Sequence, residues 1–117
     1  MRDVVELLAS IDGRPAVTIK GRYARCLHTL VQAGDKGVSP AMDDPMPRWS
    51  HYVFWLRSRY EVAIETVTEK HDGPYAGTHA RYVLHSNVAI LRTVRHGEAR
   101  DKPDLRLHHG RAPDSVS

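Results

Sequence analysis

The clearest pattern in the sequence is a helical one over residues 47–60, which read PRWSHYVFWLRSRY. Large apolar residues recur there at i, i+3, i+4, i+7 and i+11, which places them on one side of a helix. They are Trp49, Tyr52, Val53, Leu56 and Tyr60. We expect that side to be buried, with Pro47 in the first turn, where its missing N–H costs nothing. The pattern therefore predicts a helix over residues 47–60 with a polar, cationic outer side.

A second helical pattern, GRYARCLHTLVQA, covers residues 21–33. It places Tyr23, either Cys26 or Leu27, Leu30 and Val31 on one stripe. A stretch with three prolines and two glycines, which break helices, separates the two helical segments. Within that stretch the Ser-Pro pair at residues 39–40 suits an N-cap and a first helical position, and predicts one short helical turn. The sequence thus predicts a helix, a tight turn with a short second helix, and then the longer helix.

Alternating apolar and polar residues predict strands on either side of the helices. Residues 16–20, AVTIK, are rich in β-branched side chains and lie between a proline and a glycine, which favours a strand. Residues 62–68, VAIETVT, alternate strictly, and residues 80–84, ARYVL, resume the pattern after a turn that contains Gly73 and Gly77. We therefore expect a strand before the first helix and a β-hairpin with a long tip after the last.

The two ends of the chain differ from this central part. In residues 3–11, DVVELLASI, the apolar positions fall at helical spacing and Asp3 suits a cap, so we expect a helix or arm over residues 1–13. Residues 91–117 are charged, contain glycine and proline, and have little aliphatic periodicity, so we expect a disordered tail. The predicted domain then spans residues 14–90.

Composition bounds the size and the environment of the protein. The 117 residues suffice for one domain with one modest core. Cys26 is the only cysteine, so an intramolecular disulfide is excluded, and a free thiol favours a reducing compartment. No apolar run reaches the ~18 residues that a membrane span needs, and the N-terminal residues carry too many acids for a signal peptide. We therefore expect a cytoplasmic protein without membrane contact.

The sequence offers little for catalysis or metal binding. His71, Asp72 and His79 surround the predicted hairpin turn, but their spacing matches no zinc pattern. No nucleophile has an adjacent base, and no Gly-rich phosphate loop follows a strand. We therefore predict no metal, no cofactor and no enzymatic activity. The formal net charge of +3 permits a nucleic-acid partner.

The order of the predicted elements is that of a winged helix-turn-helix, in which one helix enters the DNA major groove beside a hairpin. Residues 15–84 contain KGRYARCLHTLVQAG, GVSP, PRWSHYVFWLR, IETVTEKHDGP and GTHARYVL. On these segments the chain resembles small bacterial winged helix domain proteins that are often associated with mobile elements. The resemblance implies an α+β fold with a three-helix core, a C-terminal two-stranded β-hairpin wing, and binding to double-stranded DNA. The second helix, cut short by Pro45 and Pro47, departs from that pattern.

Carried onto this sequence, the resemblance makes the outer side of helix 47–60 the recognition surface and the hairpin over residues 70–81 a contact to the DNA backbone. Arg48 is the best candidate for a guanine edge, because its guanidinium gives two parallel hydrogen bonds. The candidate DNA-binding residues on the helix are Arg48, Ser50, His51, Trp55, Ser58 and Arg59. Those on the hairpin are Lys70, His79 and Arg81, and Lys20 and Arg22 at the start of helix 21–33 are further candidates. A small transcriptional regulator or a mobile-element accessory factor is the role that fits this surface.

A protein-interaction module without DNA contact is the alternative. Phe54 and Trp55 cannot both join Trp49 on the buried stripe, so at least one of them is expected at the surface. An exposed aromatic there would suit a homodimer or the docking of another regulator. The sequence leaves this alternative open.

Overall fold

The chain is described by a computed structural model that covers residues 3–44, 46–71, 77–97 and 103–108. Two α-helices and six strands follow one another in these ranges. In chain order they are β1 (Val4–Ile11), β2 (Val17–Lys20), α1 (Gly21–Ala33), the 3-10 turn η1 (Gly34–Lys36), α2 (Trp49–Tyr60), β3 (Ile64–His71), β4 (Gly77–Leu84), β5 (Val88–Arg95) and β6 (Pro103–His108).

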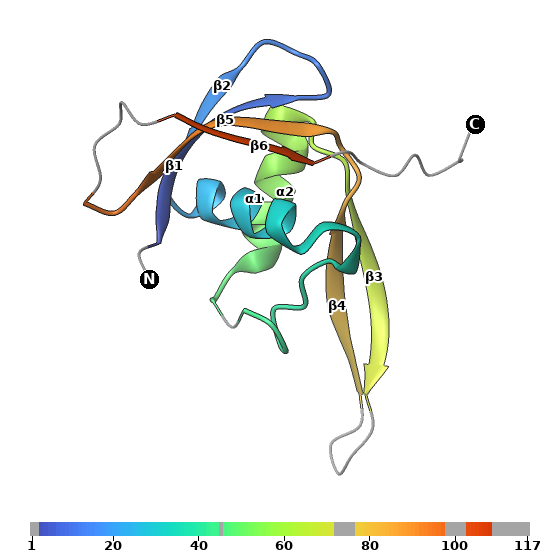
Figure 1. Ribbon diagram of the computed structural model, residues 1–117. Coiled ribbons are helices and arrows are strands. Elements are labelled where there is room, and N and C mark those ends of the chain that lie inside the picture. Colours follow the sequence, from blue (N-terminus) through green and yellow to red (C-terminus); the bar gives the residue numbers. More distant parts are fainter. Residues whose placement is uncertain (1–2, 45, 72–76, 98–102, 109–117) are drawn as a thin grey trace.

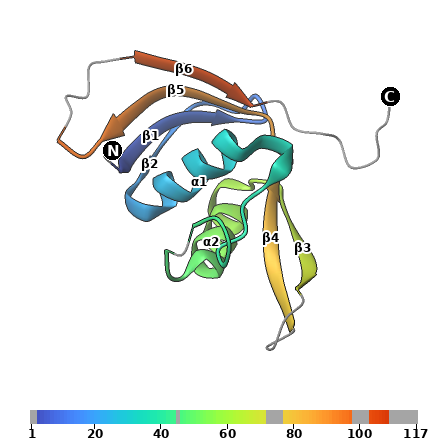
Figure 2. The ribbon, with the colours of Figure 1, turned by 60° about the horizontal axis from the view of Figure 1, so that its bottom comes forward.

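The elements form layers around α1. On one side of α1 lies a four-stranded antiparallel sheet with the strand order β2-β1-β5-β6. On the other side lies α2, and the two-stranded antiparallel hairpin β3-β4 stands beside it (Figures 1 and 2). The helix α1 is therefore central, and α2 and the hairpin share the side of the molecule that faces away from the sheet.

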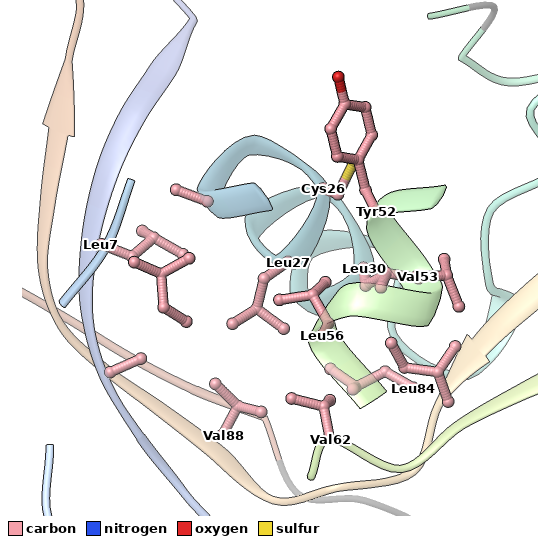
Figure 3. Packing of buried hydrophobic residues seen from close by; sticks show 14 of the residues in the cluster. Leu7, Cys26, Leu27, Leu30, Tyr52, Val53, Leu56, Val62, Leu84 and Val88 are labelled. Carbon is pink, nitrogen blue, oxygen red and sulfur yellow. The ribbon is translucent and has the colours of Figure 1, made fainter. Parts of the chain in front are cut away.

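The core fills the space between these layers. Leu7 from β1, Leu27 from α1 and Leu56 from α2 are fully buried, and Leu84 from β4 joins them from the hairpin (Figure 3). The predicted inner side of the long helix is confirmed, because its apolar residues point into this core. Their exposed fractions are 3% for Trp49, 7% for Tyr52, 1% for Val53 and 0% for Leu56, while Tyr60 is half-buried.

The connection between the helices is tied to the hairpin by a backbone bridge. The Val38 N–H donates to the Tyr82 carbonyl, and the Tyr82 N–H donates to the Val38 carbonyl, both at 2.8 Å. Gly37 makes this approach possible, because its φ of +73° favours glycine and a Cβ there would lie 2.6 Å from the Tyr82 carbonyl oxygen. Val38 thus pairs with β4 as a single residue of a third strand would.

The predicted short second helix is a single turn. The Asp43 N–H donates to the Ser39 carbonyl at 2.7 Å, and the Asp43 carboxylate accepts from the Ser39 N–H at 3.0 Å. Beyond this turn the described residues contain only α1 and α2 as α-helices, so the three-helix core is not confirmed. Pro47 lies outside the long helix, which begins at Trp49 rather than at residue 47.

Two predictions for the ends of the chain are wrong. Residues 4–11 form β1 rather than a helix, because they pair with β2 on one side and β5 on the other. The predicted disordered tail contains the end of β5 and all of β6, while residues 98–102 and 109–117 lie outside the described ranges. Of the predicted domain limits, residue 90 lies within β5, and residue 14 lies between β1 and β2. The predictions of β2 and of the β3-β4 hairpin are confirmed.

Candidate nucleic-acid interface

The exposed side of α2 carries a narrow stripe of three residues, Ser50, Phe54 and Ser58, spaced at i, i+4 and i+8. We call these three residues the outer stripe. Phe54 at its centre is 65% exposed, and no tyrosine or tryptophan side chain among the described residues is exposed. The Ser58 hydroxyl donates to the Phe54 carbonyl at 2.6 Å, so its hydrogen is used within the helix and its oxygen keeps the capacity to accept. The outer stripe is therefore neutral, with one large apolar side chain.

On the side of α2 that faces α1, the side chains pack against Tyr23. The Trp55 ring lies 4.3 Å from the Tyr23 ring between centroids, and His51 Nε2 lies 3.3 Å from the Tyr23 hydroxyl. The guanidinium of Arg59 stands 5.3 Å above the Trp55 ring in a cation-π contact. His51 and Trp55 are consequently half-buried rather than fully outward, and only Arg59 of this row is exposed.

On the side of α2 that faces the hairpin, Arg57 joins the two elements. Its guanidinium donates to the Ile64 carbonyl at 3.0 and 2.6 Å and to the Thr66 hydroxyl at 2.8 Å. The cation is thereby turned away from the outer stripe and onto the first residues of β3. Its role in the structure is to fix the angle between α2 and the hairpin.

Arg48 stands just before α2 as its N-cap residue, in the left-handed conformation with φ +69°. Its carbonyl accepts from the N–H groups of His51 and Tyr52, and its side chain is exposed. The first turn of α2 contains no acidic residue and has no side-chain cap. The unsatisfied N–H groups at this end of the helix create a positive potential that favours an anion. The charge of Arg48 adds to that potential.

Of the cations predicted on the hairpin, Lys70 is exposed and two others are engaged within the fold. Arg81 donates to Glu69 at 2.9 Å and to Asp43 at 3.1 Å, and His79 lies 3.0 Å from the same Glu69. Arg81, which hydrogen-bonds Glu69, holds the pKa of that carboxyl below its ordinary value. The pKa of Asp43 is lowered by the Ser39 N–H and, to a lesser degree, by Arg81. These contacts clamp the hairpin to the connection between the helices.

A comparison with protein families decides which fold these elements make. The model of a family described as a winged helix domain matches residues 16–94, which is more than half of the chain. The chain belongs to the winged helix domain family. No curated protein and no solved structure matches it. The predicted winged helix-turn-helix resemblance is thus confirmed at the level of the family.

In this winged helix domain, the predicted site residues separate into two groups. Arg48, Ser50, Ser58, Arg59 and Lys70 are exposed, as are Lys20 and Arg22 at the start of α1. His51, Trp55, His79 and Arg81 are half-buried and hold neighbouring elements together. Beside the start of α2 lies a surface hollow of about 290 Å³, which is lined by residues of both groups. Its lining includes Arg48, Ser50, Trp49 and His79.

Sequence reasoning missed the residues that position this surface. Asp43 and Asp44 each bind an arginine from another element, Arg81 of β4 and Arg25 of α1. Arg25 of α1 donates to both Asp44 oxygens at 3.0 and 3.1 Å, which holds the turn of residues 39–44 against α1. These ion pairs could have been suspected from the sequence, because two acidic residues stand at a predicted turn and arginines occur in the elements on both sides of it.

Neither a metal site nor a membrane span is found among the described residues. They contain no group of three or more histidines, cysteines, aspartates or glutamates that could hold a metal ion. Asp72 and the side chain of His71, which the sequence analysis weighed as ligands, lie outside those residues. Neither α1 nor α2 is long and apolar enough to cross a membrane.

Proposed function

We propose that this winged helix domain binds double-stranded DNA, with α2 in the major groove and the β3-β4 hairpin against the sugar-phosphate backbone. The observation that carries the proposal is the exposed outer stripe of α2, which lies beside the hairpin in a member of the winged helix family. The major groove of B-DNA is wide enough to admit one α-helix, and its floor presents the base edges.

Exposed cations around the stripe supply the attraction to phosphate. Arg48 lies at the start of α2, Arg59 near its end, and Lys70 on the hairpin. Lys20 and Arg22, both exposed at the start of α1, extend the cationic surface past Tyr23. Contacts from such side chains fix the orientation of a protein on the duplex without reading its sequence.

The arrangement of α2 and the hairpin is fixed before any DNA arrives. Arg57 joins α2 to β3, Arg81 joins β4 to the connection between the helices, and the Val38–Tyr82 bridge adds two backbone hydrogen bonds. Because these contacts order the surface in the free protein, binding loses less conformational entropy than it would with a loose hairpin.

Winged helix domains are typically non-enzymatic DNA-binding modules, and the role that fits this one is a small transcriptional regulator or a mobile-element accessory factor. Support for the regulatory role comes from the family, and support for the mobile element from the resemblance in sequence. Both roles require the same first property, which is affinity for duplex DNA.

Salt-dependent binding tests the proposal. Fluorescence anisotropy of a labelled duplex, measured at several salt concentrations, gives the slope of log K against log salt, which is about 0.9 for each phosphate contact. We expect Lys70→Ala to lower the slope by about one such contact and Arg48→Ala to weaken binding further. Arg92→Ala, which removes an exposed cation from β5 on the far side of α1, is the matched control. Equal affinities for all four proteins would discard the proposal.

A protein-interaction module is the second candidate, and the 65% exposure of Phe54 favours it. Trp55, the other aromatic expected at a dimer surface, packs on Tyr23 within the same chain. Light scattering of the wild type and of Phe54→Ala separates the candidates. A dimer that becomes a monomer on this substitution supports self-association through Phe54, whereas a wild type that is itself a monomer excludes it.

A further inference from the structure

The outer stripe of α2 presents an apolar side chain, which contacts between arginines and DNA do not explain. Arg57 is bound to the hairpin and Arg59 stands over Trp55, so both of these guanidinium groups are held to the sides of the helix. The residue that projects from the middle is Phe54, flanked one turn away on each side by Ser50 and Ser58. The centre of the proposed recognition helix therefore presents a phenyl ring.

Among the groups at base edges in the major groove, one is apolar. Adenine, guanine and cytosine present hydrogen-bond donors and acceptors there, whereas thymine presents a carbonyl oxygen and its C5-methyl group. A phenyl ring gains nothing from a donor or acceptor, but it removes the methyl group from water by packing against it. The occupant that matches Phe54 is therefore the methyl group of a thymine.

The surrounding charges support this placement of DNA. Exposed cations stand at the two ends of the outer stripe, Arg48 before Ser50 and Arg59 after Ser58, while the stripe itself is neutral. Phosphates lie at the rims of the groove and base edges on its floor, so a cationic rim with a neutral centre is complementary to a duplex. Ser58 is exposed and donates its hydroxyl hydrogen to the Phe54 carbonyl, so its oxygen is left able to accept from an amino group such as that of adenine.

We propose that Phe54 is a specificity-determining residue that reads thymine by packing on its C5-methyl group, so that the domain selects thymine-containing sites. This inference rests on the proposed DNA binding and adds the base that is read and the side chain that reads it. Phe54 is 65% exposed and has no part in the core, so packing within the fold does not account for a phenyl ring at this position.

The test removes the methyl group without changing a hydrogen bond. Duplexes that the wild-type protein enriches from a random pool are resynthesised with deoxyuridine in place of thymidine. We expect the wild type to bind the deoxyuridine duplex roughly fourfold more weakly for each methyl group that it contacts, the factor corresponding to ~0.8 kcal/mol. Phe54→Ala should bind both duplexes equally, and Arg92→Ala should retain the full difference.

Each outcome bears on one hypothesis. Enriched duplexes that the wild type binds equally with thymidine or deoxyuridine would overturn the reading role of Phe54 and leave DNA binding intact. Binding without any enriched sequence would do the same. A protein that binds no duplex at all would overturn the proposed function itself. If light scattering shows that Phe54→Ala converts a dimer to a monomer, Phe54 belongs to a self-association surface and the inference fails.

Discussion

Gly37→Ala probes the contact that holds the hairpin against the helices. Gly37 has φ +73° and ψ −176°, a combination that is almost exclusive to glycine. An added Cβ would lie 2.6 Å from the Tyr82 carbonyl oxygen and 2.9 Å from Val83 Cγ2. The carbonyl oxygen cannot move aside freely, because it accepts the 2.8 Å hydrogen bond from the Val38 N–H. Alanine must therefore part the connection from β4.

The magnitude follows from two contributions. The backbone conformation costs about 1–3 kcal/mol for any residue with a Cβ. Overpacking against a fixed neighbour adds about 1–3 kcal/mol. Gly34→Ala supplies the matched control, because Gly34 also has a positive φ, +61°, but nothing within 4 Å of an added Cβ. The reduced entropy of the unfolded chain is common to both substitutions and cancels in the comparison.

Urea unfolding followed by tryptophan fluorescence measures both variants, and Trp49 is a suitable reporter because its ring stacks on Tyr82 at 6.0 Å between centroids. We expect Gly37→Ala to lower the free energy of unfolding by about 1–3 kcal/mol more than Gly34→Ala does. Equal losses in the two variants would mean that the close approach of residue 37 to Tyr82 carries no cost.

Further predictions concern the backbone, the thiol and the acidic clamp. Glu61, at the C-cap of α2 with φ +53°, occupies a position that prefers glycine, so Glu61→Gly should raise the free energy of unfolding by about 1 kcal/mol; a lower melting temperature would contradict this. Burial raises the pKa of Cys26 to about 12, so a thiol reagent at pH 8 should modify it only after unfolding, and rapid modification of the native protein would disprove its burial. Because the pKa values of Glu69 and Asp43 are lowered in the fold, they stabilise it above the ordinary carboxyl pKa and lose that contribution as the pH falls. Arg81→Met should therefore flatten the acid limb of the stability curve, and an unchanged limb would exclude the clamp.

The sequence predicted those elements whose patterns are local. The apolar spacing of α2 left a single side to bury, and the strict alternation of β3 and β4 around glycines allowed only a hairpin. In β1, by contrast, Val4, Leu7, Leu8 and Ile11 are spaced as in a helix. Pairing with β2 and with β5, about 80 residues away, decides the strand, and no local pattern encodes such pairing.

The site was predictable in outline but not in detail. The exposure of Arg48 could be expected because it lies beside the apolar stripe of α2, and that of Lys70 because it lies on the hairpin. Which aromatic of the Phe54 and Trp55 pair is exposed depends on Tyr23, which packs on Trp55 from α1. Arg81 likewise looks like a free cation in the sequence, because the acids that bind it lie 12 and 38 residues away.

Backbone amide shifts of isotope-labelled protein, titrated with a duplex, show whether α2 and the hairpin form a surface for DNA. We expect shifts along residues 48–58 and around Lys70 and Thr78, with Thr18 and Arg92 on the sheet unchanged. Shifts confined to the sheet, or no shift at any amide, would contradict this interface.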